Sequence, residues 1–420
     1  MTRVKHSVGD LALFGGPPLF EQTLHVGGPN VGDRRAFFAR LEGMLDRNWL
    51  TNDGPLVREL EERIAQLLGV RHCVTICNGT VALEIAIRAL DLQGEVIVPS
   101  FTFVATPHAL WWQGIRPVFC DIDPATHCID PAQVERHITP RTTGVLGVHV
   151  WGRGCDVERL QDVADRHRLQ LLFDAAHAFA TSHGGRMIGS FGRCEVLSFH
   201  ATKFFNTFEG GAIVTNDDEL AAKTRLMRNF GFSGLDDVIY IGTNGKMCEA
   251  SAAMGLTNLE ALQPTIARNR ETYEAYREEL GSLPGLRLLQ HDDAERRNYQ
   301  YIVCEIDSEL GIARDDLVQI LHMENVRARR YFWPGCHRME PYRSLSPRAG
   351  DELPVTEAVA ERVLVLPHGG PVAVAQVRRI GALLRWIAAQ RSEVAARLAA
   401  ARASGELSSP RFSRFGVPRA

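Results

Sequence analysis

Short apolar runs alternate with stretches of helical periodicity between about residues 70 and 230, and this alternation constrains the fold more than any other feature of the sequence. The runs are rich in Val, Ile, Leu and Phe without strict apolar–polar alternation, which is typical of strands covered on both faces of a sheet. They are HCVTI, EVIVPS, RPVFCDID, TGVLGVHV, LQLLFDAA, EVLSFH and GAIVTND. Helical stretches such as Val81–Leu90 and Val157–Arg168 lie between them, so the sequence predicts an α/β fold with a mostly parallel sheet. The short link between EVLSFH and GAIVTND leaves no room for a crossover helix, so the last strand is predicted to be antiparallel.

A second, smaller α+β domain is predicted to follow this sheet. Residues 255–280 have the pattern of one long helix that Pro264 kinks or breaks, and the strand patterns YQYIVCEID and RVLVLP come after it. A helical apolar stripe lies near the end, formed by Ile380, Leu383, Leu384, Ile387, Val394 and Leu398. We therefore expect an N-terminal arm at 1–34, a large domain at 35–265, a small domain at 266–400 and a mobile polar tail at 401–420.

Composition excludes several classes of protein. The net charge of −3 over 420 residues implies no strong attraction to nucleic acid or to a membrane surface. No apolar run reaches the roughly 18 residues of a membrane span, and the first ten residues lack an apolar signal core. Nine cysteines are scattered without a paired framework, and no second pair accompanies Cys73 and Cys77 as a zinc site would need. We expect a cytoplasmic protein with reduced thiols and no metal.

Lysine is rare in this chain, which makes its positions informative. Of 47 Lys and Arg residues only Lys5, Lys203, Lys223 and Lys246 are lysines. Arg stays protonated, whereas a partly buried Lys can lose its proton and form a Schiff base with a carbonyl. Lys203 follows the predicted strand EVLSFH and is a candidate for such chemistry. Lys223 is the contrasting case, because it lies four residues after Glu219 on a predicted helix and is expected to form a surface ion pair with it.

Three candidate site residues lie where the first predicted strand turns into a helix. Asn78, Gly79 and Thr80 follow HCVTI directly. Ligands of open α/β sheets bind beyond the carboxyl ends of the strands, and free N–H groups at a helix start favour an anion such as phosphate. The alternative is an ordinary helix N-cap.

Further candidates lie at the ends of other predicted strands. Asp174 ends LQLLF, where a buried carboxylate needs a cation or hydrogen-bond donors, unless it is a structural helix cap. His177 follows three residues later and is either catalytic or a packed, hydrogen-bonded histidine. Phe103 follows EVIVPS and could stack on a flat ring or belong to the core. Together with Ser198 and Lys203, these residues form the set that pyridoxal phosphate needs: an amine, a carboxylate, an aromatic plate and phosphate donors.

The motifs NGTVAL, VIVPSFTFVATPHA, FDAAHA and SFHATK…EGGAIVTND resemble the DegT/DnrJ/EryC1/StrS family of pyridoxal phosphate-dependent sugar aminotransferases, over nearly all of residues 35–390. The resemblance implies the aspartate aminotransferase-type fold (fold type I), with a seven-stranded, mostly parallel sheet in the large domain. It also implies a homodimer with active sites at the subunit interface.

The resemblance assigns roles to individual residues. Lys203 is implied to form the Schiff base with pyridoxal 5'-phosphate and then to move protons as general acid and base. The implied cofactor contacts are Asp174 at the pyridine nitrogen, His177 beside the ring hydroxyl, Phe103 on the ring, Gly79, Thr80 and Ser198 on the phosphate with Asn78 alongside, and Asn244 on the partner's phosphate. Lys246, in the same GTNGKM loop as Asn244, is either a site residue or a surface charge.

The resemblance also implies the reaction. Relatives mostly transfer an amino group from L-glutamate to a keto sugar on a nucleotide, while some replace the lysine by His and eliminate water. The motifs here are most similar to those of enzymes that aminate C4 of dTDP-4-keto-6-deoxy-D-glucose, giving dTDP-4-amino-4,6-dideoxy-D-glucose for antibiotics or surface polysaccharides. Amination at C3, another nucleotide sugar, a keto-pentose and a dehydratase remain alternatives. Candidate substrate contacts are the stretches 49–55, 147–156 and 329–343, and the last contains the expected contacts Arg330, Tyr331 and His337.

Overall fold

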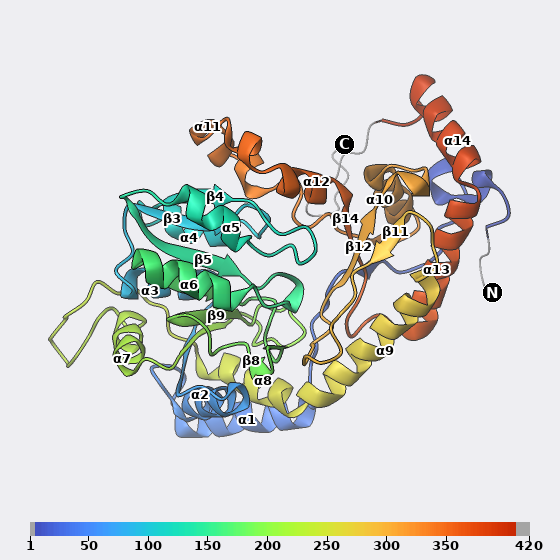
Figure 1. Cartoon of the computed structure of the whole chain (residues 1–420). Coiled ribbons are helices and arrows are strands. Elements are labelled where there is room, and N and C mark those ends of the chain that lie inside the picture. Colours follow the sequence, from blue (N-terminus) through green and yellow to red (C-terminus); the bar gives the residue numbers. More distant parts are fainter. Residues whose placement is uncertain (1–4, 409–420) are drawn as a thin grey trace.

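The computed structural model describes residues 5–408 and shows a large domain and a smaller one, connected by a long helix (Figure 1). The large domain is built on a seven-stranded sheet in the order β2-β10-β9-β6-β5-β3-β4. Its strands are β2 (His72–Ile76), β3 (Glu95–Pro99), β4 (Arg116–Cys120), β5 (Thr142–Val148), β6 (Gln170–Asp174), β9 (Cys194–Ser198) and β10 (Gly211–Thr215). All seven predicted strands are therefore confirmed.

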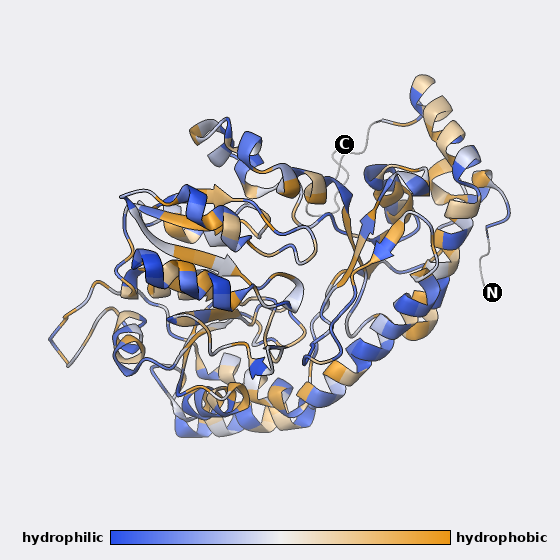
Figure 2. Cartoon of the chain, in the orientation of Figure 1, coloured by the Kyte–Doolittle hydropathy of each residue, from blue (hydrophilic) through white to orange (hydrophobic). Residues whose placement is uncertain are grey.

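Strand directions also agree with the sequence prediction. β4, β3, β5, β6 and β9 pair in parallel, whereas β10 is antiparallel to both β9 and β2. Every residue of β3 and β10 is buried, as expected for strands covered on both faces. Figure 2 shows the apolar residues concentrated along the strands, with polar residues on the outer faces of α6 and α9.

Helices cover both faces of this sheet. They are α1 (Arg34–Arg47), α2 (Pro55–Leu68), α3 (Gly79–Ala89), α4 (Ala105–Trp111), α5 (Pro131–Val134), α6 (Val157–His167), α7 (Asp218–Met227) and α8 (Glu249–Glu260). A small hairpin, β7 (Ser182–His183) and β8 (Arg186–Met187), follows β6. The two helices expected at Val81–Leu90 and Val157–Arg168 are α3 and α6, so both predictions are confirmed within two residues at each end.

The helix predicted for residues 255–280 is broken, which agrees with the predicted kink or break, but the break lies at Ala261 rather than at Pro264. α8 ends at Glu260 and α9 (Leu262–Leu280) begins beyond Ala261. Pro264 lies in the first turn of α9, where the backbone N–H that it lacks would have no partner within the helix.

The smaller domain has a three-stranded antiparallel sheet in the order β11-β12-β14. Its strands are β11 (Leu286–Leu288), β12 (Ile302–Ile306) and β14 (Val363–Leu366), and its helices are α10 (Arg314–Met323), α11 (Tyr342–Leu345), α12 (Pro354–Arg362), α13 (Val374–Ala389) and α14 (Arg391–Ala403). The apolar stripe expected near the end is divided between α13 and α14 and is buried throughout. Of the predicted tail, residues 401–403 continue α14, while residues 409–420 lie outside the described part of the chain.

The N-terminal segment packs on the smaller domain. β1 (Leu24–His25) pairs in parallel with β13 (Val326–Arg327), and Lys5 forms a buried ion pair of 2.9 Å with Glu324. Short 3-10 turns occur at Val8–Asp10, Ala12–Phe14, Glu135–His137, Val150–Gly152, Ser308–Leu310, Cys336–Arg338 and Ala349–Glu352.

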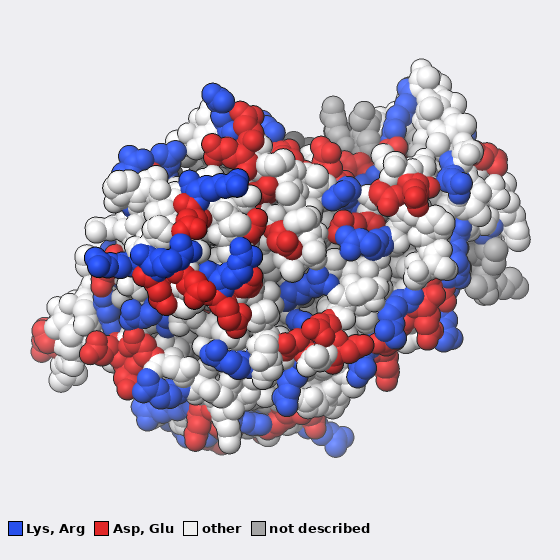
Figure 3. Space-filling view, viewed as in Figure 1, with Lys and Arg blue, Asp and Glu red and all other residues white. Residues whose placement is uncertain are grey.

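Charges of both signs are interspersed over the face seen in Figure 3, in keeping with the small net charge. Within residues 5–408, no helix combines the length and the apolar character that a membrane crossing requires.

Candidate active site

Lys203 lies in the loop that joins β9 to β10, at the carboxyl end of β9. Its side chain is half-buried with the amine end enclosed, and Nζ donates a hydrogen bond to the Tyr301 hydroxyl at 3.4 Å. Burial lowers the pKa of Lys203 to about 8, although the negative charge of Asp174 acts in the opposite direction. At pH 7 about one amine in ten is then neutral, against about one in three thousand at the ordinary pKa. The fold thus provides a nucleophilic amine near neutral pH.

Asp174 ends β6, the strand beside β9, and its carboxylate is buried near Lys203. One carboxylate oxygen accepts a hydrogen bond from the Thr106 hydroxyl at 2.8 Å, and the other accepts from the Ala176 backbone N–H at 3.0 Å. Burial raises the pKa of Asp174, while these two donors and the charge of Lys203 lower it. The carboxylate is therefore held in a dry place with donors that favour its ionised form.

His177 is packed among aromatic rings. Trp151 and Phe332 stack on each other at 5.3 Å, and His177 lies beside them, nearly parallel, with its ring centroid 5.9 Å from each and 4.6 Å from the Tyr301 ring. Its Nδ1 accepts a hydrogen bond from the Trp151 backbone N–H at 3.3 Å. Burial, with the nearby charge of Lys203, holds the pKa of His177 well below its usual value, so the ring is neutral. A neutral ring with Nδ1 as acceptor leaves Nε2 carrying the proton.

Gly79 and Ser198 come together at the edge of the same site, because β10 alone separates β2 from β9. A Cβ atom on Gly79 would lie 3.1 Å from the Ser198 Cβ and 3.3 Å from its Oγ, so a side chain there would crowd Ser198. Asn78 is the N-cap of α3, and its side chain accepts from the Val81 N–H at 2.9 Å. Asn78 is therefore a helix N-cap, as the alternative interpretation of this residue predicted. Thr80 is exposed in the first turn of α3, where helix N–H groups have no partner within the helix.

A cavity of about 610 Å³ opens between the β3–α4 loop, the N-terminal segment and the loop after β13. Phe103 lies on its wall with 45% of its surface exposed, and Arg330 and Tyr331 lie on the same wall. His337 does not line this cavity. Its ring is buried, with Nδ1 2.7 Å from the Ser100 Oγ and Nε2 2.5 Å from a carboxylate oxygen of Glu357.

Asn244 is placed apart from the residues above. It is exposed and forms an isolated bridge with Asn229. Lys246 also belongs to this loop, and its Nζ donates to the Asn229 side chain at 2.9 Å and lies 4.7 Å from the Phe230 ring centroid. Among the contacts of residues 5–408, none joins Asn244 to Lys203, so its role remains a prediction about the partner subunit's site.

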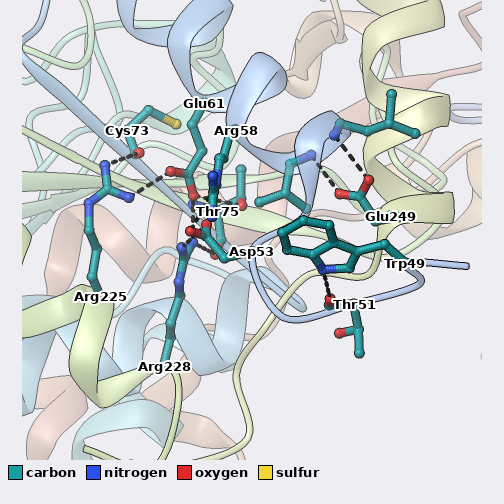
Figure 4. Close-up of polar contacts among 12 residues, drawn as sticks. Trp49, Thr51, Asp53, Arg58, Glu61, Cys73, Thr75, Arg225, Arg228 and Glu249 are labelled. Atoms are coloured by element: carbon teal, nitrogen blue, oxygen red, sulfur yellow. Dashed lines mark hydrogen bonds and ion pairs between the residues drawn. The ribbon is translucent and has the colours of Figure 1, made fainter. Parts of the chain in front are cut away.

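A buried polar cluster fixes the loop at Trp49–Gly54 (Figure 4). Glu61 accepts hydrogen bonds from Arg225 and Arg228, and Arg228 also binds the Asp53 carboxylate at 2.9 Å. Trp49 remains 40% exposed. The cluster holds this loop, a candidate substrate contact, against the end of α7.

Lys223 does not pair with Glu219, so that prediction is wrong. Its Nζ lies 2.8 Å from both carboxylate oxygens of Asp91, in the turn after α3. The helix around Lys223 is confirmed as α7, but a carboxylate far away in the sequence is a better-placed partner than the one on the same helix.

Four residues that the sequence did not single out complete the site. They are Thr106 on Asp174, and Trp151, Tyr301 and Phe332 around His177. Trp151 belongs to a stretch already suspected as a whole, and its positive φ of 60° is not visible in the sequence. No local signal marks Tyr301, which lies 98 residues after Lys203.

The fold and this site define a class: an α/β enzyme of the aspartate aminotransferase type, with a buried amine and a buried carboxylate at the ends of neighbouring strands. The profile of the DegT/DnrJ/EryC1/StrS aminotransferase family matches residues 32–385, and the chain belongs to this family. The predicted family, fold class and enzyme class are thereby confirmed.

Individual relatives agree with this assignment. The dTDP-4-amino-4,6-dideoxy-D-glucose transaminase of Escherichia coli is 36% identical over 348 residues, which cover 83% of this chain and 94% of that protein. The GDP-perosamine synthase of Caulobacter vibrioides is 34% identical over 346 residues, covering 81% and 92%. A crystal structure of DesI in the presence of its TDP-sugar product is 51% identical, covers 93% of this chain and 99% of that chain, and superposes with a TM-score of 0.89.

Proposed function

We propose that this enzyme uses pyridoxal phosphate to transfer an amino group from L-glutamate to C4 of dTDP-4-keto-6-deoxy-D-glucose. The observation that carries the proposal is that Asp174 ends β6, that Lys203 follows the neighbouring strand β9, and that the two influence each other's charge. An amine with a pKa of about 8 and a buried carboxylate lie at the ends of adjacent strands and act on each other electrostatically.

The residues present fit this cofactor. Gly79 avoids the crowding that a Cβ would cause beside Ser198, and the start of α3 offers backbone N–H groups, which suits a phosphate. Phe103 presents an exposed ring at the end of β3. Asp174 is a buried carboxylate that calls for a cationic partner. Bound pyridoxal phosphate supplies an aldehyde that takes up an amine and a ring that accepts an electron pair.

Each protein group then has a defined task. Asp174, with Thr106 and Ala176 donating to its carboxylate, would hold the ring nitrogen of the cofactor and favour its protonated form. His177, neutral and carrying its proton on Nε2, can donate a hydrogen bond to the ring oxygen. Lys203 Nζ takes the proton from the substrate carbon that bears the amine and returns a proton in the second half of the reaction. The aromatic enclosure of Trp151 and Phe332 excludes water on the His177 side.

The relatives support the sugar. The E. coli transaminase is named for dTDP-4-amino-4,6-dideoxy-D-glucose, and the DesI structure contains a TDP-sugar product. Similarity to GDP-perosamine synthases favours a GDP-linked 4-keto sugar as the second candidate. The lysine at position 203 argues against the dehydratase alternative, in which relatives carry His.

We also propose a homodimer with shared sites. Large apolar side chains are exposed on α1 and on the segment between α7 and Asn244, including Phe38 at 53%, Leu45 at 62%, Leu235 at 96% and Ile241 at 75%. Covering such surfaces with a second copy would bring Asn244 toward the partner's site. Light scattering on the purified protein tests this directly, and a stable monomer at micromolar concentration would contradict it.

The deciding experiment runs the reaction in reverse. The enzyme loaded with pyridoxal phosphate is mixed with dTDP-4-amino-4,6-dideoxy-D-glucose, and the change in cofactor absorbance is followed, with glutamate measured after 2-oxoglutarate is added. A rapid absorbance change followed by glutamate formation supports both C4 and the dTDP carrier. A cofactor band that responds only to the GDP-linked 4-amino sugar would select the second candidate, and no response to any 4-amino sugar would refute C4 chemistry.

A further inference from the structure

Three arginines of one short segment converge on the cavity beside the active site. Arg327, Arg329 and Arg330 all line it, and among residues 5–408 no Asp or Glu does. All three positive charges act on the ring of His322, another lining residue, and together with burial they lower its pKa. The three arginines therefore line the same cavity as His322, and Arg327 is in direct contact with its ring.

Carboxylates in the surrounding structure balance only part of this charge. Arg330 pairs with Asp315 at 2.7 Å, and the same carboxylate also binds Arg314. Arg327 and Arg329 pair with no carboxylate within residues 5–408; Arg327 reaches the Nδ1 of His322 at 3.5 Å, and Arg329 lies 4.9 Å from the centroid of the Tyr331 ring. An aromatic face holds a guanidinium in place without neutralising it, so the cavity keeps positive charge that an anion can use.

Two aromatic side chains, Tyr331 and Tyr301, connect Arg329 with the reacting amine. Its charge acts on Tyr301, whose hydroxyl accepts the hydrogen bond from Lys203 Nζ at 3.4 Å. The ring on which Arg329 stacks, Tyr331, acts electrostatically on Lys203 itself. The Tyr331 ring centroid lies 6.4 Å from that of Tyr301, so an anion bound by Arg329 would lie two aromatic side chains away from Lys203.

The two substrates of the proposed reaction differ in where they carry negative charge. In an α-amino acid, the carboxylate is bonded to the carbon that bears the amine. In a sugar aminated at C4, the diphosphate is attached at C1, across the ring from the reacting carbon. Both substrates react at the same lysine, so an anion subsite two side chains away from Lys203 suits the carboxylate, which a guanidinium binds through two parallel hydrogen bonds.

We propose that Arg329, supported by Arg327, binds the α-carboxylate of the amino donor and so forms the donor subsite of the enzyme. The proposal rests on the proposed transamination and names the residues that recognise its amino-acid substrate. Arg330, which was expected to contact substrate, is held by Asp315 and positions the segment.

The test separates the two half-reactions of the holoenzyme. Single-turnover rates are measured against L-glutamate for the enzyme loaded with pyridoxal phosphate, and against the keto sugar nucleotide for the aminated form. Arg329→Gln is expected to raise the half-saturating glutamate concentration about 10- to 100-fold, the size of a lost charge-assisted pair, and to change the nucleotide-sugar half-reaction less than about twofold. Arg343→Gln is the matched control, because Arg343 is exposed and pairs only with Glu340 nearby, and neither half-reaction should change.

A binding measurement provides a second readout that does not depend on turnover. Calorimetric titration of the holoenzyme with glutarate should show binding that Arg329→Gln removes and Arg329→Lys partly restores. Unchanged cofactor absorbance and melting temperature show that the variants are folded. If Arg329→Gln does not fold, Arg329→Lys and Arg327→Gln are compared with wild type in the same two half-reactions and in glutarate binding.

The outcomes distinguish this proposal from the proposed function. If wild type reacts with glutamate but with no 4-keto sugar nucleotide, the sugar assignment fails and the donor subsite is still measured. If wild type does not react with glutamate yet binds glutarate through Arg329, the subsite stands and the donor is another carboxylic amino acid. If Arg329→Gln weakens the nucleotide-sugar half-reaction instead, or leaves both half-reactions and glutarate binding unchanged, the donor subsite is refuted.

Discussion

The hydrogen bond from Thr106 to Asp174 gives a prediction whose size can be worked out from the structure. Thr106 is fully buried, and its hydroxyl lies 2.8 Å from the carboxylate of Asp174. In Thr106→Val the shape of the side chain is kept and the donor is lost. A hydrogen bond to a charged acceptor contributes about 1.5–3 kcal/mol, and one pKa unit corresponds to about 1.4 kcal/mol, so the pKa of Asp174 should rise by about one to two units.

The direction of the effect on activity follows from the role of the carboxylate. Asp174 acts in its ionised form, and a raised pKa means that this form is lost at a higher pH as the solution is acidified. The acidic limb of the pH profile of the glutamate half-reaction should therefore move to higher pH by about one to two units. The rate on the plateau above this limb should change little.

Thr102→Val is the control for this measurement. The Thr102 hydroxyl lies 2.9 Å from the Thr106 hydroxyl and has no hydrogen bond to Asp174, so the acidic limb should move by less than half as much. An unchanged acidic limb in Thr106→Val, with cofactor binding and melting temperature as in wild type, would refute the reasoning that this donor keeps Asp174 ionised.

Three further predictions concern single residues. Lys203→Ala should keep the fold, measured by circular dichroism, and lower the single-turnover rate at least about 10²- to 10⁴-fold; a variant with near wild-type rates would remove Lys203 from the mechanism. Burial raises the pKa of Asp174, so its ionised form opposes folding above the pKa of the unfolded state. The cofactor-free Asp174→Asn protein should therefore be more stable to urea than wild type at pH 7, with the gain shrinking toward about pH 4, and equal stabilities at pH 7 would contradict this. Lys5→Met should lower the free energy of unfolding by about 3–5 kcal/mol, because it leaves Glu324 charged and buried at 0% exposure; a change below about 1 kcal/mol in urea unfolding would show that the pair does not anchor the arm.

The sheet and the centre of the site could be predicted from the sequence because both depend on local patterns. A strand buried on both faces needs an unbroken apolar run, and ligands gather where such strands end, so Lys203 and Asp174 could be placed together before their contacts were known. The pairing of Lys223 with Asp91 could not be predicted, since it depends on how α7 lies against the turn after α3. The same limit applies to Tyr301, which no local pattern connects with Lys203.

His337 shows a related limit. The resemblance to the family suggested contact with substrate, and the structure shows its ring buried between Ser100 and Glu357. A sequence motif indicates that a position holds a histidine. It does not show whether the histidine ring contacts a ligand or packs behind the residues that do.

The strand order of the large sheet has a consequence for how the protein is made on the ribosome. β2 is among the first strands to be synthesised, but its neighbour in the sheet is β10, whose first residue, Gly211, comes 135 residues after Ile76. During that interval β2 has no strand beside it, and the proposed phosphate site has only Gly79, because Ser198 is also still to come. Insertion of β10 completes both together. The ability to capture the cofactor therefore appears late in synthesis, and cofactor capture by nascent chains of increasing length would mark the point at which the sheet closes.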